Sequence, residues 1–99
     1  MSRSIRFEWD ERKAARNLAK HGVSFEVAAL VFADPFALTV QDRIENAEQR
    51  WQTLGMAAGY LLLLVAHVVG EDEDGTEVIG IISARKADRK ERIRYEQDR

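Results

Sequence analysis

The chain has 99 residues, of which 45% are hydrophobic and 32% are charged, and this composition is typical of a globular chain with a single domain over residues 1–99. It contains no cysteine, which excludes a disulfide scaffold, a thiolate zinc site and a cysteine nucleophile. The two histidines, His21 and His67, are far apart and belong to no local ligand motif. We therefore expect neither a metal nor another cofactor.

The charges are segregated along the chain, although the net charge is only -2. Residues 1–20 carry six basic and three acidic side chains, residues 21–79 carry two and ten, and residues 80–99 carry seven and four. If the two basic ends meet in space, they form a surface that attracts phosphate groups. Solvated helix faces would explain the same distribution without any ligand.

No segment resembles a signal peptide or a membrane span. The N-terminus lacks an apolar core, and the longest apolar run, residues 60–69, is interrupted by His67. This run is about half of the roughly 20 residues that a transmembrane helix needs. We therefore expect a cytoplasmic protein that does not contact the membrane.

The first elements are predicted to be a short strand and a helix. Apolar side chains alternate with charged ones over residues 5–9, as in a strand with one buried face. Asp10 can cap a helix over residues 11–21, and Gly22 can end it in the left-handed conformation. On this helix we expect Ala14, Leu18 and His21 on one side and a basic stripe of Arg12, Arg16 and Lys20.

A second helix is predicted between Ser24, as its N-cap, and the Asp34-Pro35 pair, which ends it. It is apolar nearly all round, so it must be covered on nearly all sides. Packing in the core explains this pattern, and a partner chain on the outer side is the alternative. The candidate partner-binding residues are Phe25, Leu30 and Phe32.

The rest of the chain is predicted to form strands and a final helix. A strand from residue 36 and a polar loop over 42–48 precede three strands, 49–57, 60–69 and 76–85, which form an antiparallel meander with 60–69 near its middle. Asp88 and Glu91 have the spacing of a capping box for a helix that ends near Gln97. Ile93 and Tyr95 are its only large apolar residues, so we expect weak attachment.

This order predicts an α+β fold in which two N-terminal helices cover one face of a mainly antiparallel sheet and leave the other face free. Motifs throughout the chain also resemble the BrnT toxin family. They are Phe7-Glu8-Trp9-Asp10, Lys13, Asn17, Lys20-His21-Gly22-Val23-Ser24-Phe25-Glu26, Val31-Phe32, Asp34-Pro35, Arg50, Gly55, His67 and Ile81-Ile82-Ser83-Ala84-Arg85-Lys86-Ala87.

The resemblance implies a RelE-like fold with a C-terminal helix and the activity of a ribonuclease toxin that inhibits translation in a bacterial type II toxin–antitoxin system. It also implies neutralisation by a BrnA antitoxin with a ribbon-helix-helix domain, in a complex of two toxins with two antitoxins. Operator DNA would then be bound only through the antitoxin. The alternative is a module that binds RNA or an antitoxin without cleaving RNA.

Metal-independent cleavage of RNA through a 2′,3′-cyclic phosphate needs proton transfer and, above all, cations that stabilise the charge on phosphorus. The candidates for catalysis are Lys20, His21, Arg50, His67 and Arg85. The candidates for binding the RNA backbone are Arg12, Arg16, Lys86, Arg89 and Arg92.

Each candidate also has a simpler interpretation. His21 can close its helix, Arg50 can pair with the acidic residues before it, and His67 lies on an apolar strand face, which favours a buried structural role. Gly80 stands where related chains often carry an arginine, and strict alternation places it on the face of Ile82, Ala84 and Lys86. We therefore expect Arg50 and Arg85 to carry more of the charge stabilisation.

Overall fold

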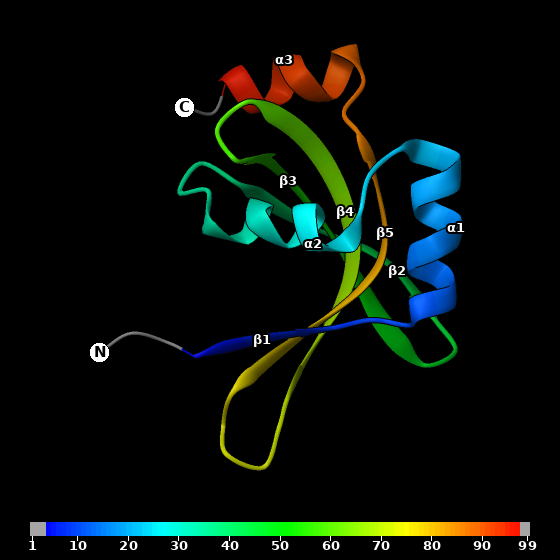
Figure 1. Ribbon diagram of the computed structural model, residues 1–99. Coiled ribbons are helices and arrows are strands. Elements are labelled where there is room, and N and C mark those ends of the chain that lie inside the picture. Colours follow the sequence, from blue (N-terminus) through cyan, green and yellow to red (C-terminus); the bar gives the residue numbers. More distant parts are fainter. Residues whose placement is uncertain (1–3, 98–99) are drawn as a thin grey trace.

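The computed structural model describes residues 4–97, which form one sheet with helices on both of its faces (Figure 1). The elements are β1 (Ile5–Glu8), α1 (Glu11–His21), α2 (Phe25–Ala28), the 3-10 helix η1 (Ala29–Ala33), β2 (Leu38–Glu45), β3 (Glu48–Ala57), β4 (Leu61–Glu71), β5 (Glu77–Lys86) and α3 (Arg89–Gln97). None of the helices in this range is long and apolar enough to span a membrane.

The sheet has five strands in the order β1-β5-β4-β3-β2. Strands β2 to β5 are antiparallel neighbours, and β1 joins the edge of β5 in parallel. The predicted α+β class, the meander and the central position of β4 are confirmed. β1 and β2 are the two edge strands, so the long strands β3, β4 and β5 form most of the two faces of the sheet.

The ends of α1 follow the prediction. The Asp10 carboxylate accepts hydrogen bonds from the backbone N–H groups of Arg12 and Lys13, and Gly22 adopts φ 70°. The residue that α1 buries against the sheet is Asn17, which is 7% exposed, whereas Leu18 is 51% exposed. A polar residue is turned toward the sheet here because its amide has backbone partners there.

Two other elements differ from their predicted form. Only Phe25–Ala28 of the predicted second helix is α-helical, and the chain continues as the tighter η1 until Asp34 leaves the helical conformation. The predicted loop over residues 42–48 is mostly strand, because β2 extends to Glu45 and turns at Asn46 and Ala47. Both turn residues have positive φ, as a two-residue hairpin requires, although neither is glycine.

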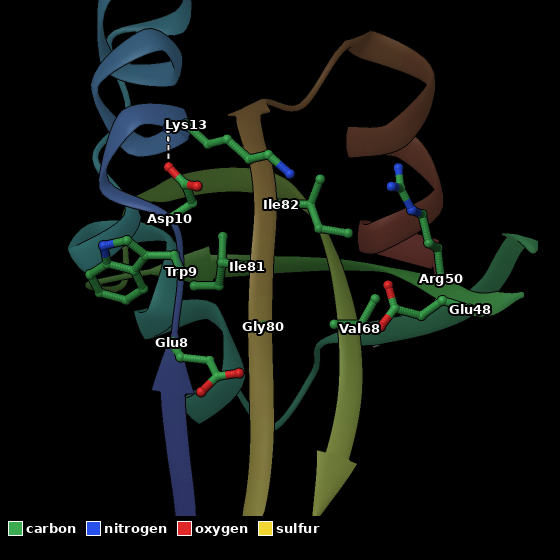
Figure 2. Close-up of a pocket in the computed structure, with 10 residues that line it drawn as sticks. All are labelled: Glu8, Trp9, Asp10, Lys13, Glu48, Arg50, Val68, Gly80, Ile81 and Ile82. Atoms are coloured by element: carbon green, nitrogen blue, oxygen red, sulfur yellow. Dashed lines mark hydrogen bonds between the residues drawn. The ribbon is translucent and has the colours of Figure 1, made fainter. Parts of the chain in front are cut away.

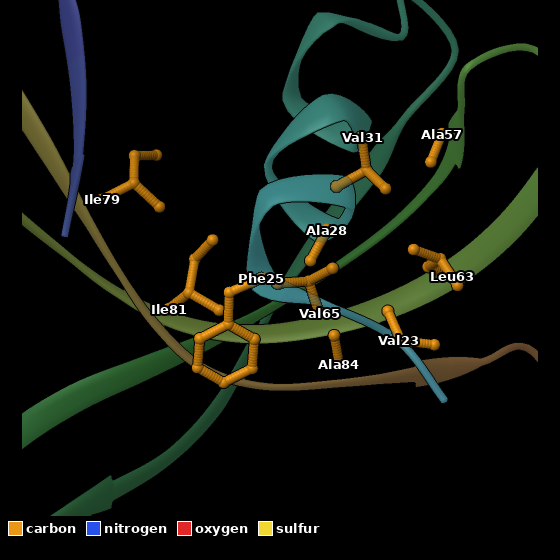
Figure 3. Close-up of a cluster of buried hydrophobic side chains, with 10 residues drawn as sticks. All are labelled: Val23, Phe25, Ala28, Val31, Ala57, Leu63, Val65, Ile79, Ile81 and Ala84. Carbon is orange, nitrogen blue, oxygen red and sulfur yellow. The ribbon is translucent and has the colours of Figure 1, made fainter. Parts of the chain in front are cut away.

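The main core lies between the sheet and the segment formed by α2 and η1 (Figure 3). Gly55 allows this segment to approach β3, because a Cβ atom there would lie 3.1 Å from the Cβ and carbonyl oxygen of Val31. The buried members of this core are Val23, Phe25, Ala28, Val31, Ala57, Leu63, Val65, Ile79, Ile81 and Ala84.

A second, smaller core lies on the opposite face of the sheet, where Tyr95 of α3 packs with Leu54, Leu62 and Leu64. This face is therefore partly covered, and the expected weak attachment of α3 was wrong. Tyr95 is 3% exposed, and its hydroxyl donates a 2.6 Å hydrogen bond to Asp34 Oδ2. One aromatic side chain thus joins the C-terminal helix both to the sheet and to the end of η1.

We predict that Tyr95→Phe lowers the free energy of unfolding by about 1–3 kcal/mol, because it removes a hydrogen bond to a carboxylate and leaves the ring in place. Tyr60→Phe is the matched control, since Tyr60 is 78% exposed. Urea unfolding measures both. Equal stabilities of the two variants would contradict the proposed anchoring of α3 through this hydroxyl.

Candidate functional site

The buried side chain of Asn17 joins α1 to β5. Its Nδ2 donates hydrogen bonds to the carbonyl oxygens of Val23 (3.0 Å) and Ala84 (2.8 Å), and its Oδ1 accepts one from the backbone N–H of Ala84 (3.1 Å). An amide can satisfy the donor and the acceptor of one strand residue together. These bonds set the position of α1 relative to β5, and therefore the position of the basic side chains on that helix.

Three adjoining hollows lie between α1 and the sheet face that α3 partly covers. In the first, Lys13 reaches from α1 across β5, and Arg50 stands on β3 on the other side of Ile82 (Figure 2). Its volume of about 450 Å³ lies within the range of small-molecule sites, roughly 300–1,000 Å³. The carboxylates of Glu8, Asp10 and Glu48 also line it, so this end has mixed charge.

The second and third hollows continue the first. Lys13 and Ile82 line both the first and the second, and Lys20, His21 and Ser83 line both the second and the third. We call their basic lining residues the cationic belt: Lys13, Arg16, Lys20, His21, Arg50 and Arg85. No acidic residue is among those that line the second and third hollows.

The belt includes four of the five predicted catalytic residues, because Lys20, His21 and Arg85 line the third hollow and Arg50 lines the first. Basic side chains from residues 1–20 and Arg85 from residues 80–99 therefore line the same hollow. Lys13 and Arg16 complete the belt from α1.

A β-bulge determines which side chains of β5 face the belt. Ser83 is opposite Ala66 and Ile81 is opposite His67, so Ile82 is an extra residue in β5. As a result, Gly80 and Arg85 lie on the same face, and the placement of Gly80 with Ala84 and Lys86 was wrong. Gly80 lines the first hollow. The position for which the family resemblance implies an arginine therefore faces this site.

The two belt arginines that stand on strands, Arg50 and Arg85, are both paired with carboxylates. Arg50 Nη1 lies 2.7 Å from Glu45 Oε2 on the neighbouring strand, and its side chain is 21% exposed. Arg85 is bound by Glu91 of α3 through two hydrogen bonds of 2.8 and 2.9 Å. Hydrogen bonding to Glu91 raises the pKa of Arg85, and the same bonds lower the pKa of Glu91.

The prediction of His67 as a catalytic residue is wrong, because its side chain lies in the core on the opposite face of the sheet from the belt. It is 2% exposed, its Nε2 lies 2.8 Å from Thr53 Oγ1, and its ring contacts the ring of Phe32 edge to face. Burial lowers the pKa of His67 to about 4. The imidazole is therefore neutral and structural.

The predicted RNA-binding residues are divided. Arg16 lines the second hollow, whereas Arg12, Arg89 and Arg92 are exposed outside the three hollows. Lys86 is opposite Leu63 on the other face of the sheet, which places it away from the belt.

The predicted partner-binding residues also differ in exposure. Phe25 is fully buried and belongs to the core, so its prediction as a contact residue was wrong. Phe32 is half-buried against Phe7 and His67, and Leu30 is 46% exposed. Of the three, Leu30 offers the most surface to a partner.

Sequence reasoning gave no role to Lys13, Asn17 or the side chain of Glu91 beyond its helix cap. Lys13 is three residues from Asp10 and seven from Lys20, so helical spacing alone could have placed it on the side of Lys20. The pairing of Glu91 with Arg85 depends on the turn between β5 and α3, which no sequence pattern specifies. Within residues 4–97, no three His, Asp or Glu side chains are grouped to hold a metal ion.

A sequence profile of the family described as "Ribonuclease toxin, BrnT, of type II toxin-antitoxin system" matches residues 9–91. The chain belongs to the BrnT family. Its members are ribonuclease toxins, which implies an RNA substrate and an antitoxin partner. No curated protein sequence matches the chain significantly.

The fold is also that of a BrnT protein. The crystal structure of the Brucella abortus ribonuclease toxin BrnT superposes with a TM-score of 0.64 at 24% sequence identity, over 87% of this chain and 99% of that chain. The five-stranded sheet with its flanking helices is therefore an arrangement already seen in a crystal structure.

We predict that burial of His67 makes this BrnT chain less stable in mild acid. The unfolded chain takes up a proton near pH 6.5, whereas the folded chain takes it up only near pH 4. Above about pH 6.5, His67 is neutral in both states and does not lower the free energy of unfolding. As the pH falls below this value, the unfolded chain binds the proton more readily, so the free energy of unfolding decreases by about 2 kcal/mol between pH 7.5 and 5.

Urea unfolding at these two pH values tests this prediction, with His67→Gln as the control for the other titrating groups. The difference in stability between the two pH values should be about 2 kcal/mol smaller in the variant. A variant with the same pH dependence as the natural chain would contradict the prediction.

Proposed function

We propose that this BrnT chain is a metal-independent endoribonuclease whose reaction takes place along the cationic belt. One observation carries the proposal: basic side chains from α1, β3 and β5 line three adjoining hollows on one face of the sheet. RNA has one phosphate per nucleotide, and a row of cations at a groove suits consecutive phosphates of one strand.

In the proposed reaction, the 2′-hydroxyl oxygen attacks the neighbouring phosphorus, the bond from phosphorus to the 5′-oxygen breaks, and a 2′,3′-cyclic phosphate remains. The 2′-hydroxyl loses its proton to a base, and the departing oxygen gains one from an acid. Fixed cations stabilise the additional charge on the phosphoryl oxygens, which is commonly the largest contribution. Arg50, Arg85 and Lys20 are assigned this role.

The belt also offers groups for proton transfer. His21 lies half-buried between the second and third hollows, where its imidazole can exchange a proton with bound RNA. Glu8 and Glu48 provide carboxylates in the first hollow, beside Lys13 and Arg50. Asp10 is less available, because its carboxylate caps α1. A base and several cations are thus within one continuous groove.

The family also suggests how the activity is controlled. We propose that the chain acts in the cytoplasm, inhibits translation by cleaving RNA and is neutralised by a BrnA-type ribbon-helix-helix antitoxin in a two-plus-two complex. Operator DNA would be bound only through that antitoxin. The exposed Leu30 beside Pro35 and Met56 is a candidate contact for it. The proposed relationship to RelE-like toxins remains a prediction.

We predict that the double variant Arg50→Ala, Arg85→Ala cleaves RNA at least about 100-fold more slowly than the natural chain, because two charge-stabilising groups are lost. Antitoxin-free protein is assayed on labelled RNA with a chelator present, and the products are tested for a cyclic phosphate end.

The control is Arg43→Ala, Lys90→Ala, which removes the same net charge from exposed positions outside the belt. It should retain most of the activity. Full cleavage by the first double variant would refute the assignment of the belt. RNA binding without products, by the natural chain, would instead favour the non-catalytic module.

A further inference from the structure

The ion pair of Arg85 and Glu91 uses only part of the guanidinium. Glu91 accepts from Nη1 and Nη2, the two nitrogens at the end of the group, and Nη1 also donates to the Lys86 carbonyl oxygen at 3.3 Å. Within residues 4–97, no hydrogen bond engages Nε of Arg85. A guanidinium has five N–H donors, so the edge formed by Nε and Nη2 remains able to bind an anion.

Glu91 is the more firmly held partner of this pair. Its Oε1 also accepts the backbone N–H of Asp88 at 2.9 Å, and its own N–H donates to Asp88 Oδ1 at 2.8 Å, so the predicted capping box is confirmed. The side chain of Glu91 is 16% exposed, compared with 41% for Arg85. The carboxylate is therefore a fixed support, and the guanidinium is the group that reaches the third hollow.

The rest of α3 keeps this support in place. Tyr95 is buried between the sheet and Asp34, one turn beyond Glu91 on the same helix. A free arginine side chain loses about 2 kcal/mol of conformational entropy when it is ordered. Because Glu91 orders Arg85 in the folded chain, the binding of a phosphate does not have to overcome this loss of entropy.

We propose that Glu91 is a positioning residue of the ribonuclease reaction: it holds the Arg85 guanidinium so that its Nε edge binds an RNA phosphate in the hollow shared with Lys20 and His21. This inference rests on the proposed function of the belt. An arginine that is held bidentately by a carboxylate can still bind a phosphate through its second edge. A carboxylate that merely competes with phosphate for Arg85 would have the opposite effect on activity.

The test compares cleavage of a labelled RNA by the natural chain and by Glu91→Ala, Glu91→Gln, Glu96→Ala and Asp88→Ala. We expect Glu91→Ala to lower kcat by about 10- to 100-fold with little change in KM, because the cation is misplaced. Glu91→Gln retains one acceptor and should lie between Glu91→Ala and the natural chain. Glu96→Ala removes the same charge from an exposed position on α3 and should have nearly full activity.

Asp88→Ala separates positioning from helix capping. It removes the acceptor of the Glu91 backbone N–H but keeps the Asp88 backbone N–H that binds Glu91 Oε1, so the carboxylate stays beside Arg85. The Tm should fall by about 4–8 °C, while kcat, measured well below the Tm, stays near that of the natural chain. The proposal is overturned if Asp88→Ala loses as much kcat as Glu91→Ala. It is also overturned if Glu91→Ala is as active as Glu96→Ala or more active.

An NMR measurement distinguishes failure of this inference from failure of the proposed function. The Nε–Hε signal of Arg85, assigned by its absence in Arg85→Lys, should be sharp and displaced in the natural chain, and should shift when inorganic phosphate is added. In Glu91→Ala it should move to the position of a mobile arginine. A signal at the same position in Glu91→Ala and in the natural chain, or one that phosphate does not shift, overturns the inference. A natural chain that shows the expected signal and phosphate shift but cleaves no RNA overturns the proposed function, while the holding of Arg85 by Glu91 for an anion stands.

Discussion

The hydrogen bonds of Asn17 fix the relative position of the two parts of the molecule that carry the basic groups. α1 has an exposed apolar residue, Leu18, on its outer side and presents a buried amide to β5. Three hydrogen bonds to Val23 and Ala84 add to the apolar contact that Ala14 of this helix makes with the main core. Because such bonds are directional, they specify the rotation of α1 more narrowly than apolar contact does, and this rotation directs Lys13 and Lys20 toward the belt.

The two faces of the sheet have different tasks. One face is closed by α2 and η1 and contains the main core, including the neutral His67. The other face is open except where Tyr95 packs. On this face the belt arginines of β3 and β5, Arg50 and Arg85, have carboxylate partners. Glu45 of β2 holds Arg50 in place, and Glu91 of α3 holds Arg85. A chain with a net charge of -2 can thus present hollows that are lined by basic side chains.

The features that the sequence predicted correctly depend on neighbouring residues. The caps of α1 at Asp10 and Gly22 and the capping box of Asp88 with Glu91 are short-range patterns with their own hydrogen bonds. The errors involve contacts between distant segments. Asn17 is buried because its amide binds the backbone of Ala84 on β5. His67 lies in the core because η1, which carries Phe32, covers its face of the sheet. Gly80 lies on the other face than predicted because Ile82 is an extra residue in β5. Charge segregation together with the family resemblance predicted that Lys20, Arg50 and Arg85 lie close together. Lys20 and Arg85 line the third hollow, and Arg50 lines the first.

The central claim is that side chains from α1 and from the sheet act on RNA as one site, and a double-mutant cycle between Lys20 and Arg85 tests it most directly. Cleavage rates of the natural chain, Lys20→Ala, Arg85→Ala and the double variant give the coupling energy between the two residues. If both cations act on one bound strand in the third hollow, the effects are non-additive by about 0.5–3 kcal/mol. Strictly additive effects, or the absence of any effect of Lys20→Ala, would contradict a shared site.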